Sequence, residues 1–137
     1  MKEKYKTALM DMAERFGQTS EAERLKVGCL LYKNDMIISL GVNGQPPGWP
    51  IEHCESYNNR TLETVRHAED AALQKLYNST ETSQGAEMFI SHAPCLSCAI
   101  KIKTAKISKV YYRNIYRSEE GLEYLSNSQG IAVPTVC

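Results

Sequence analysis

Three side chains in this sequence have the types and spacing of metal ligands. Cys95 and Cys98 form a Cys-x-x-Cys pair directly after Pro94, where a strand is expected to end and a helix to begin, and His67 lies upstream. A thiolate at a helix N-terminus is stabilised by the helix dipole and by free N–H groups. Two sulfurs and one imidazole leave the fourth position of a tetrahedral Zn²⁺ open, which is typical of catalytic rather than structural zinc sites.

Glu69 lies two residues after His67 and adds a proton carrier to this group. On a helix, an offset of two residues points side chains in nearly opposite directions, so Glu69 is badly placed to be a fourth ligand. It can instead move protons to and from a water molecule whose pKa zinc lowers to about 7. His-x-Glu followed by Pro-Cys-x-x-Cys is the pattern of zinc nucleobase deaminases. A Cys-x-x-Cys pair alone would also fit a redox dithiol or a structural zinc knuckle.

The elements that must position these residues alternate between helix and strand. Apolar periodicity predicts helices over 2–16, 62–78, 95–105 and 119–127, and strands over 27–32, 36–42, 87–92, 107–112 and 130–134. This order predicts an α/β fold in which one mixed sheet has helices on both faces. The first two strands should form an antiparallel hairpin through Lys33-Asn34-Asp35, and the strands separated by helices should pair in parallel. Residues at the carboxyl ends of the strands, such as Asn43 and Cys95, are then well placed to bind a ligand.

Composition and charge restrict the class of protein. The 137 residues suit a single domain over 1–137, with 42% hydrophobic residues and 16 basic against 16 acidic residues. A neutral chain argues against a polynucleotide partner, which would want a broad basic surface. No apolar run predicts a membrane span or a signal peptide, and five scattered cysteines suit reduced thiols. We therefore expect a cytoplasmic protein.

Across nearly its whole length the sequence resembles the cytidine deaminase superfamily, and within it the deoxycytidylate (dCMP) deaminases of bacteriophage type. The resemblance rests on Lys26 to Cys29, the G-x-N-G-x-P-x-G segment at 41–48, Cys54-Glu55, His67-Ala68-Glu69, the 94–98 segment and the strand at 109–112. The segment at 41–48 discriminates most, because other branches usually share only its asparagine. This resemblance implies a three-layer α/β/α sandwich around a central mixed five-stranded sheet.

The resemblance also implies an activity and roles for individual residues. His67, Cys95 and Cys98 match the ligands of one catalytic Zn²⁺, and Glu69 matches the group that carries protons to N3 and to the departing ammonia. Asn43 matches the residue that holds the sugar hydroxyl, the backbone at Ala93 matches the contact to the exocyclic amine, and Ala68 belongs to the same substrate site. The implied reaction is hydrolysis of dCMP to dUMP and ammonia, which feeds thymidylate synthesis.

Two departures from the family pattern stand beside these matches. The family usually reads His-Ala-Glu-x-Asn-Ala, whereas position 71 here is alanine. In relatives, the position of His92 is often apolar, and the position of Ala93 often carries a hydroxyl or an aromatic side chain. The alternatives are therefore a deaminase of another cytidine or adenosine substrate, or a catalytically silent zinc module that senses nucleotides.

Charge distribution, independent of resemblance, indicates a small anionic substrate. Six cations and no carboxylate lie between residues 88 and 118. We interpret the four lysines as a solvated face. Arg113, Tyr116 and Arg117 follow directly on a strand, where guanidinium groups could grip one phosphate.

Relatives are commonly hexamers, regulated by dCTP and dTTP bound near the loop at 41–48. By resemblance we expect a homo-oligomer, and an allosteric nucleoside triphosphate with Mg²⁺ at Gly44, Gln45, Pro46, Gly48 and Trp49. Some phage relatives hold a second, structural zinc in a region that His53-Cys54 resembles. Here Cys29 is the one further residue that could join that pair, so we do not expect a second zinc.

Overall fold

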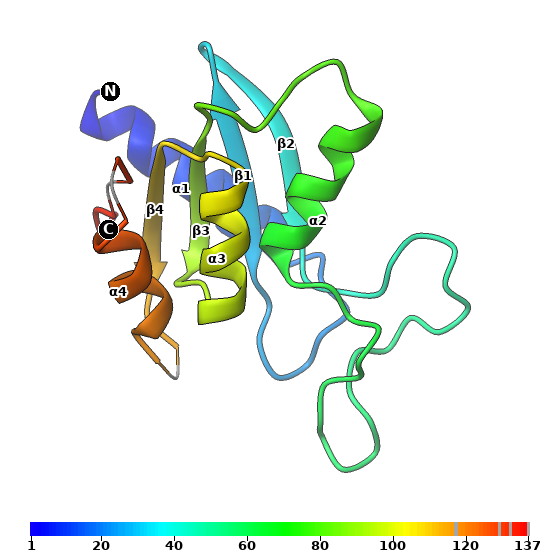
Figure 1. Cartoon of the computed structure of the whole chain (residues 1–137). Coiled ribbons are helices and arrows are strands. Elements are labelled where there is room, and N and C mark those ends of the chain that lie inside the picture. The colour runs from blue at the N-terminus through cyan, green and yellow to red at the C-terminus, as the bar shows by residue number, and fades with distance from the viewer. Residues whose placement is uncertain (117, 129, 132, 137) are drawn as a thin grey trace.

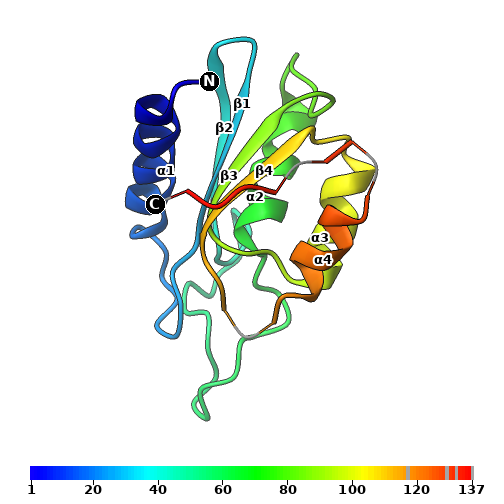
Figure 2. The same cartoon turned by 90° about the vertical axis from the view of Figure 1, so that its left-hand side faces the viewer.

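The computed structural model describes residues 1–116, 118–128, 130–131 and 133–136. Its helices are α1 (Glu3–Gly17), α2 (Ala68–Lys75), α3 (Leu96–Thr104) and α4 (Glu120–Ser126), with a 3₁₀ turn, η1 (Leu76–Asn78), after α2. Its strands are β1 (Gly28–Lys33), β2 (Met36–Val42), β3 (Glu87–His92) and β4 (Lys109–Asn114). They form three layers, with α1 on one face of the sheet and α2, α3 and α4 on the other (Figures 1 and 2).

The sheet is mixed, with the strand order β2-β1-β3-β4. β1 pairs antiparallel with both β2 and β3, and β3 pairs parallel with β4. The predicted hairpin is thus confirmed. The expectation that all later strands pair in parallel is wrong for β3. The crossover through α2 does make β2 and β3 parallel to each other, but β1 lies between them and pairs antiparallel with both.

The prediction of a five-stranded sheet is corrected to four strands within the described residues. The segment predicted as the fifth strand does run beside β4, where Thr135 forms a single parallel bridge with Tyr112. Two backbone hydrogen bonds hold it there: Tyr112 N donates to Pro134 O at 3.4 Å, and Val136 N donates to Tyr112 O at 2.8 Å. Pro134 itself has no N–H to donate, which limits further pairing. Such short pairing does not extend into a ladder.

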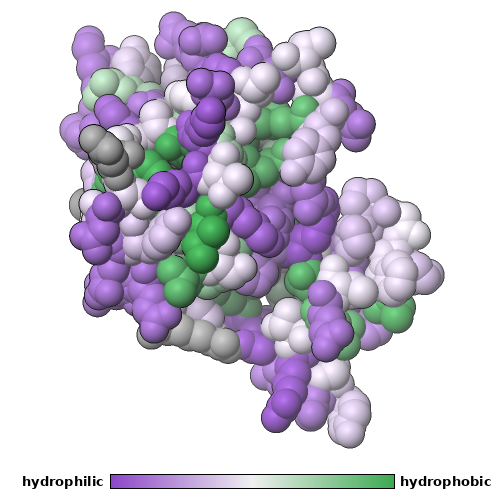
Figure 3. Space-filling model, viewed as in Figure 1, coloured by the Kyte–Doolittle hydropathy of each residue, from purple (hydrophilic) through white to green (hydrophobic). Residues whose placement is uncertain are grey.

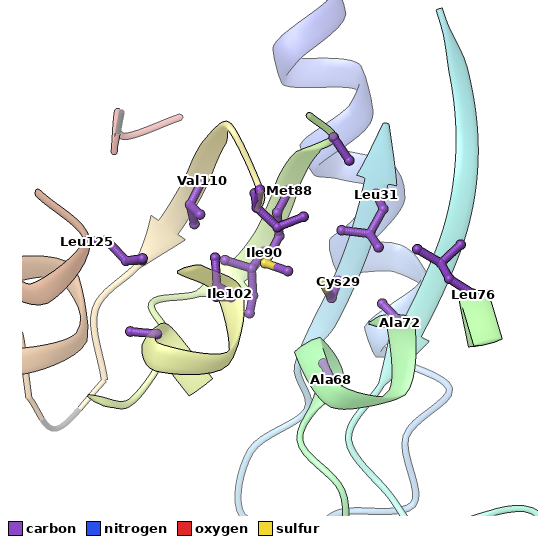
Figure 4. Packing of buried hydrophobic residues seen from close by; sticks show 13 residues of the cluster. Cys29, Leu31, Ala68, Ala72, Leu76, Met88, Ile90, Ile102, Val110 and Leu125 are labelled. Carbon is purple, nitrogen blue, oxygen red and sulfur yellow. The ribbon is translucent and has the colours of Figure 1, made fainter. Parts of the chain in front are cut away.

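Side chains alternate between the two faces of the sheet and build two apolar clusters. Met88 and Ile90 of β3 face α2 and α3, together with Cys29, Leu31 and Val110 (Figure 4). Phe89 and Tyr111 face α1, where their rings stack with centroids 4.4 Å apart. Burial on both faces explains why β1 and β3 read as continuous apolar runs rather than alternating ones.

The predicted helix over 62–78 is shorter in the structure, because residues 62–67 do not join α2. Arg66 forms an antiparallel bridge with Gly44, in which Arg66 N donates to Gly44 O at 2.8 Å and Gly44 N to Arg66 O at 3.1 Å. The long segment between β2 and α2 therefore stays irregular. It projects at the end of the sheet where α2 and α3 begin (Figure 1). Within the described residues, no helix has the length and apolar character required to cross a membrane.

Candidate metal centre and substrate pocket

The structure brings the three predicted ligands together at the starts of two helices. His67 is the N-cap of α2, Cys95 is the N-cap of α3, and Cys98 lies in the first turn of α3. The Nδ1 atom of His67 lies 3.1 Å from Cys98 Sγ and 3.7 Å from Cys95 Sγ. These are the only His, Cys, Asp or Glu residues among those described that form a cluster of three or more, with all ligand atoms within 4.8 Å of one another.

This arrangement fits a tetrahedral zinc ion. With Zn–S near 2.3 Å and Zn–N near 2.0 Å, tetrahedral geometry separates a nitrogen and a sulfur ligand by about 3.5 Å. The observed nitrogen–sulfur distances of 3.1 and 3.7 Å lie on either side of that value. His67 and Cys95 are exposed whereas Cys98 is buried, so the cluster is open on one side. The three residues would hold zinc and leave its fourth position facing the open side.

Close backbone packing fixes the two helix starts. A side chain at Gly41 of β2 would place its Cβ 2.4 Å from both Ala68 O and Ala72 N, so only glycine lets α2 approach the sheet this closely. Gly121 of α4 similarly packs on the backbone before α3, where a Cβ would lie 2.1 Å from Pro94 O. Lys101 and Asp70 then join α3 to α2 through an ion pair of 2.9 Å.

The protonation states of the cluster suit a cation. The pKa of Cys95 is lowered to about 3, because the thiol of Cys98 and then His67 donate hydrogen bonds to its sulfur. The same hydrogen bond to Cys95 raises the pKa of Cys98, with burial adding to the effect. The pKa of His67 is raised, chiefly by its hydrogen bond to Cys95. One thiolate is therefore formed in the absence of metal, and a bound cation would favour deprotonation of the second thiol and of the imidazole.

Glu69 is the second residue of α2, in its first turn beside this cluster, and is only 4% exposed. Burial raises its pKa from 4.5 to about 7. Near neutral pH the carboxyl group is thus divided between its protonated and ionised forms, which is the condition for efficient proton transfer in both directions. Glu69 does not belong to the three-residue cluster of possible ligands.

A cavity of about 320 Å³ opens beside the cluster, a size that suits a small molecule. His67, Ala68, Glu69 and Cys95 form its wall at the helix starts. The opposite side comes from segments before β1 and after β2, β3 and β4; the other lining residues are Ala22, Arg24, Leu25, Val27, Asn43, Cys54, Glu55, Thr61, Val65, His92, Ala93, Tyr116 and Ser118. The carboxyl ends of β2, β3 and β4 therefore meet at the site, together with the amino end of β1.

Four of the predicted substrate residues line this cavity, namely Asn43, Ala68, Ala93 and Tyr116. The Asn43 amide also fixes the segment before β1, because its Oδ1 accepts from Val27 N at 2.9 Å and its Nδ2 donates to Leu25 O at 2.8 Å. An asparagine side chain has two N–H donors and two acceptor lone pairs, so one of each remains for a ligand.

Arg113 does not line the cavity, contrary to our expectation of a phosphate contact. Its side chain reaches α1, where Nη2 lies 2.8 Å from Asp11 and Nη1 lies 3.3 Å from Glu14. The reason is strand alternation, which puts Arg113 on the same face of β4 as Tyr111. Arg117, the other predicted arginine, lies outside the described residues.

The residues predicted for an effector form a separate loop. None of Gly44, Gln45, Pro46, Gly48 and Trp49 is among the described residues that line the cavity. Gln45 instead joins two parts of the long segment, donating to His53 O at 3.0 Å and accepting from Thr64 Oγ1 at 2.6 Å. Neither His53 nor Cys54 belongs to a cluster of three or more possible metal ligands among the described residues.

Sequence reasoning missed Arg24, Glu55 and His92 as cavity residues. Glu55 accepts hydrogen bonds from Glu23 N at 3.1 Å and Arg24 N at 3.3 Å. These bonds attach the irregular segment between β2 and α2 to the chain before β1. No local pattern predicts such a contact. The departure at His92 was a usable signal, because it is a polar residue at the carboxyl end of a buried strand.

Comparison with known proteins agrees with this geometry. Residues 3–114 match the family model described as the cytidine and deoxycytidylate deaminase zinc-binding region. The chain is similar to a crystal structure of dCMP deaminase from the cyanophage S-TIM5 in complex with dCMP and dUMP, with 41% identity, a TM-score of 0.94 and 98% of each chain covered.

Two curated relatives are more distant. Deoxycytidylate deaminase of Saccharomyces cerevisiae is 31% identical over 97% of this chain, which spans only 45% of the yeast protein. An uncharacterised deaminase of Aliivibrio fischeri is 32% identical over 79% of this chain and 71% of its own length.

Proposed function

The chain belongs to the family defined by the cytidine and deoxycytidylate deaminase zinc-binding region, and from this premise we propose that it hydrolyses dCMP to dUMP and ammonia. The observation that supports dCMP as the substrate is the full-length similarity to the S-TIM5 enzyme, whose structure holds dCMP and dUMP. We propose that residues 1–137 act as one catalytic domain, with His67, Cys95 and Cys98 holding a single zinc.

Zinc, when bound, supplies Lewis acidity and lowers the pKa of a bound water to about 7. Glu69 does the proton transfers: its carboxylate takes one proton of the attacking water and gives it to N3 of the pyrimidine. It then takes the second proton of that water and delivers it to the amine that leaves from C4. One water is consumed, the bond between C4 and the exocyclic nitrogen breaks, and ammonia departs. A pKa of about 7 lets Glu69 accept and donate with little energetic cost at neutral pH.

The remaining cavity residues orient the nucleotide. Ala93 N donates to Asn114 O at 2.7 Å, which holds the backbone after β3 in place and leaves the Ala93 carbonyl to accept from the exocyclic amine. Ala68 packs against the sheet and brings the start of α2 up to the base. The second N–H and lone pair of Asn43 are available to a sugar hydroxyl.

The direct test is ammonia release from the zinc-loaded protein given dCMP, deoxycytidine, dCTP or an RNA oligonucleotide. We expect turnover of dCMP well above that of the other substrates. Glu69→Gln serves as the matched control, because it should keep the zinc and lose turnover. Turnover of RNA or deoxycytidine at the dCMP rate would point to another deaminase. No turnover by fully metallated protein would point to a silent zinc module.

We also propose a nucleoside triphosphate effector with Mg²⁺ at the Gly44–Trp49 loop. Trp49 is the single tryptophan of the chain and is 45% exposed, so its fluorescence reports directly on this loop. Quenching by dCTP with Mg²⁺, reversed by chelation, is the expected result. An unchanged spectrum at saturating dCTP would remove the effector from this loop.

A homo-oligomer, a hexamer by resemblance to the family, is the proposed assembly. Leu96 and Ile100 of α3 are 40% and 45% exposed, and separate apolar patches interrupt the hydrophilic surface in the view of Figure 3. Apolar side chains on one exposed helix face suit burial against a second copy. Light scattering should give a mass several times that of the chain, and a monomer at micromolar concentration would contradict the proposal.

A further inference from the structure

The segment between β2 and α2 forms part of the cavity wall without belonging to the core. Four residues from 45–65 line the cavity, namely Cys54, Glu55, Thr61 and Val65. Neither apolar cluster of the described chain includes a residue from 45–65, and Cys54 is the only one of them that is buried. A part of a protein with few buried apolar contacts opens at a low free energy. Residues 45–65, the lid, can therefore move without disturbing the sheet.

Hydrogen bonds hold the lid together and give it a base. Within the lid, Leu62 N donates to Cys54 O at 2.8 Å. At its two ends, the backbone groups of Gly44 and Arg66 exchange hydrogen bonds of 2.8 and 3.1 Å. Figure 1 shows this part of the chain projecting from the layers of the fold. The lid is thus an ordered unit that would swing about its base between β2 and α2.

One latch attaches the lid to the rest of the described chain. The Glu55 carboxylate accepts from Glu23 N at 3.1 Å and from Arg24 N at 3.3 Å. Arg24 Nη1 donates in return to Asn59 O at 3.3 Å and to Thr61 Oγ1 at 3.2 Å. Among the described residues, every hydrogen bond between the lid and the remaining chain ends at Glu23 or Arg24, and no ion pair joins the two parts.

The latch ends on a part of the chain that is fixed to the sheet. Asn43, at the end of β2, accepts from Val27 N at 2.9 Å and donates to Leu25 O at 2.8 Å through its side-chain amide. Ala22, Leu25 and Val27 line the cavity from this side. The latch therefore joins a fixed wall of the cavity to a movable one, and breaking it would separate the two walls.

We propose that the lid opens and closes over the cavity and that Glu55 holds it shut. Glu55 acts through the backbone of Glu23 and Arg24, so it is a positioning residue and not a catalytic one. A ligand enclosed between the two walls enters and leaves when the latch opens, and such motions often limit turnover. The lid goes beyond the proposed function, from which its test takes only the ligand, dUMP.

The first test measures opening in the ligand-free, zinc-loaded protein. The variants are Glu55→Ala and Glu55→Gln, with Glu52→Ala, an exposed carboxylate of the same lid, as the matched control. Trypsin cleaves after Arg60 in the lid and after Lys103 in α3, and mass spectrometry separates the two rates. Circular dichroism and zinc content establish the fold, and urea unfolding measures the stability of the whole domain.

Glu55→Ala should raise the rate of cleavage after Arg60 by about 10- to 100-fold, the effect expected when hydrogen bonds to a charged group are lost. Cleavage by a protease follows the population of the open form. The rate after Lys103 and the urea midpoint should stay at wild-type values, because the lid contributes nothing to the two clusters. Glu55→Gln keeps one acceptor oxygen and should lie between Glu55→Ala and wild type, and Glu52→Ala should match wild type.

The second test measures how fast dUMP binds and leaves, by stopped-flow fluorescence of Trp49, the single tryptophan, which lies in the lid. When a lid controls both entry and exit, weakening its latch raises the association and dissociation rate constants together. Both should rise by about 10- to 100-fold in Glu55→Ala, while Kd changes little. Loss of a direct ligand contact would raise the dissociation rate constant alone.

Three results would overturn the proposal. Cleavage after Arg60 at the wild-type rate in Glu55→Ala would show that Glu55 is not the latch. A urea midpoint that falls together with faster cleavage after Lys103 would make Glu55 part of the general frame. Faster dissociation of dUMP with unchanged association would make Glu55 a ligand contact. If the wild type binds no dUMP and turns over no dCMP, the proposed function fails by itself, and the cleavage rates of the ligand-free protein still decide the latch.

Discussion

The burial of Glu69 predicts that its carboxyl group destabilises the metal-free fold. The unfolded state releases this proton near pH 4.5 and the folded state near pH 7, so between these values the folded state binds more protons. The free energy of unfolding must then fall as the pH rises, by about 1.4 kcal/mol per pH unit. A pKa raised from 4.5 to about 7 corresponds to about 3 kcal/mol in the free energy of unfolding, and this contribution is fully lost above pH 7.

Glu69→Gln removes the ionisation while keeping the shape of the protonated acid. In urea unfolding of chelator-treated protein, we expect the variant and the wild type to be equally stable near pH 4.5. The variant should be about 3 kcal/mol more stable at pH 8. Glu63→Gln, at an exposed position in the preceding segment, should show no pH-dependent difference. Parallel stability profiles for Glu69→Gln and wild type from pH 4.5 to 8 would refute the reasoning. The zinc-loaded variant should lose turnover by about 10²- to 10⁴-fold.

Two further predictions concern the frame of the site. Cys98→Ser should reduce bound zinc, measured by atomic absorption, from one per chain to almost none. Chelation of the wild type should abolish turnover, and added Zn²⁺ should restore it. Activity that survives complete chelation would contradict a metal centre. Gly41→Ala should lower the free energy of unfolding by about 1–3 kcal/mol and weaken zinc retention, because the new Cβ meets Ala68 O and Ala72 N at 2.4 Å. Gly44→Ala is its control, with nothing within 4 Å of the added Cβ, and equal losses would reject the packing argument.

The metal ligands could be predicted because each is fixed by its own neighbours in the chain. Cys95 is the N-cap of α3 and Cys98 lies one turn later, and Pro94 was enough to predict that helix start. Apolar periodicity placed the start of α2 too early, at residue 62 instead of Ala68, so His67 was identified by its residue type and its spacing to Glu69 and not by the helix start. What sequence could not supply was the distance between the two helices, which depends on glycine contacts and on one ion pair across the layer.

The structure places Arg113 away from the cavity for the opposite reason. Arg113 was selected for its place after a strand, although period-two alternation with the buried Tyr111 already assigned it to the α1 face. Arg24 carries no local signal. Its orientation depends on Asn59 and Thr61, which are 35 and 37 residues away in a segment without regular structure. The same segment was assigned to a helix on its apolar spacing, and its bridge to Gly44 overrode that preference.

The features that weaken this fold are the ones that its proposed chemistry requires. A carboxyl group with a pKa near 7 needs a site where water is scarce, and that desolvation is a cost to the metal-free protein. Cation binding at the neighbouring cluster offsets this cost, since a positive charge beside Glu69 favours its ionised form and binding to the folded state stabilises it. Metal affinity and Glu69 basicity are therefore linked. Glu69→Gln, which cannot ionise, should for this reason bind zinc more weakly than wild type at pH 8 while its metal-free form unfolds at higher urea.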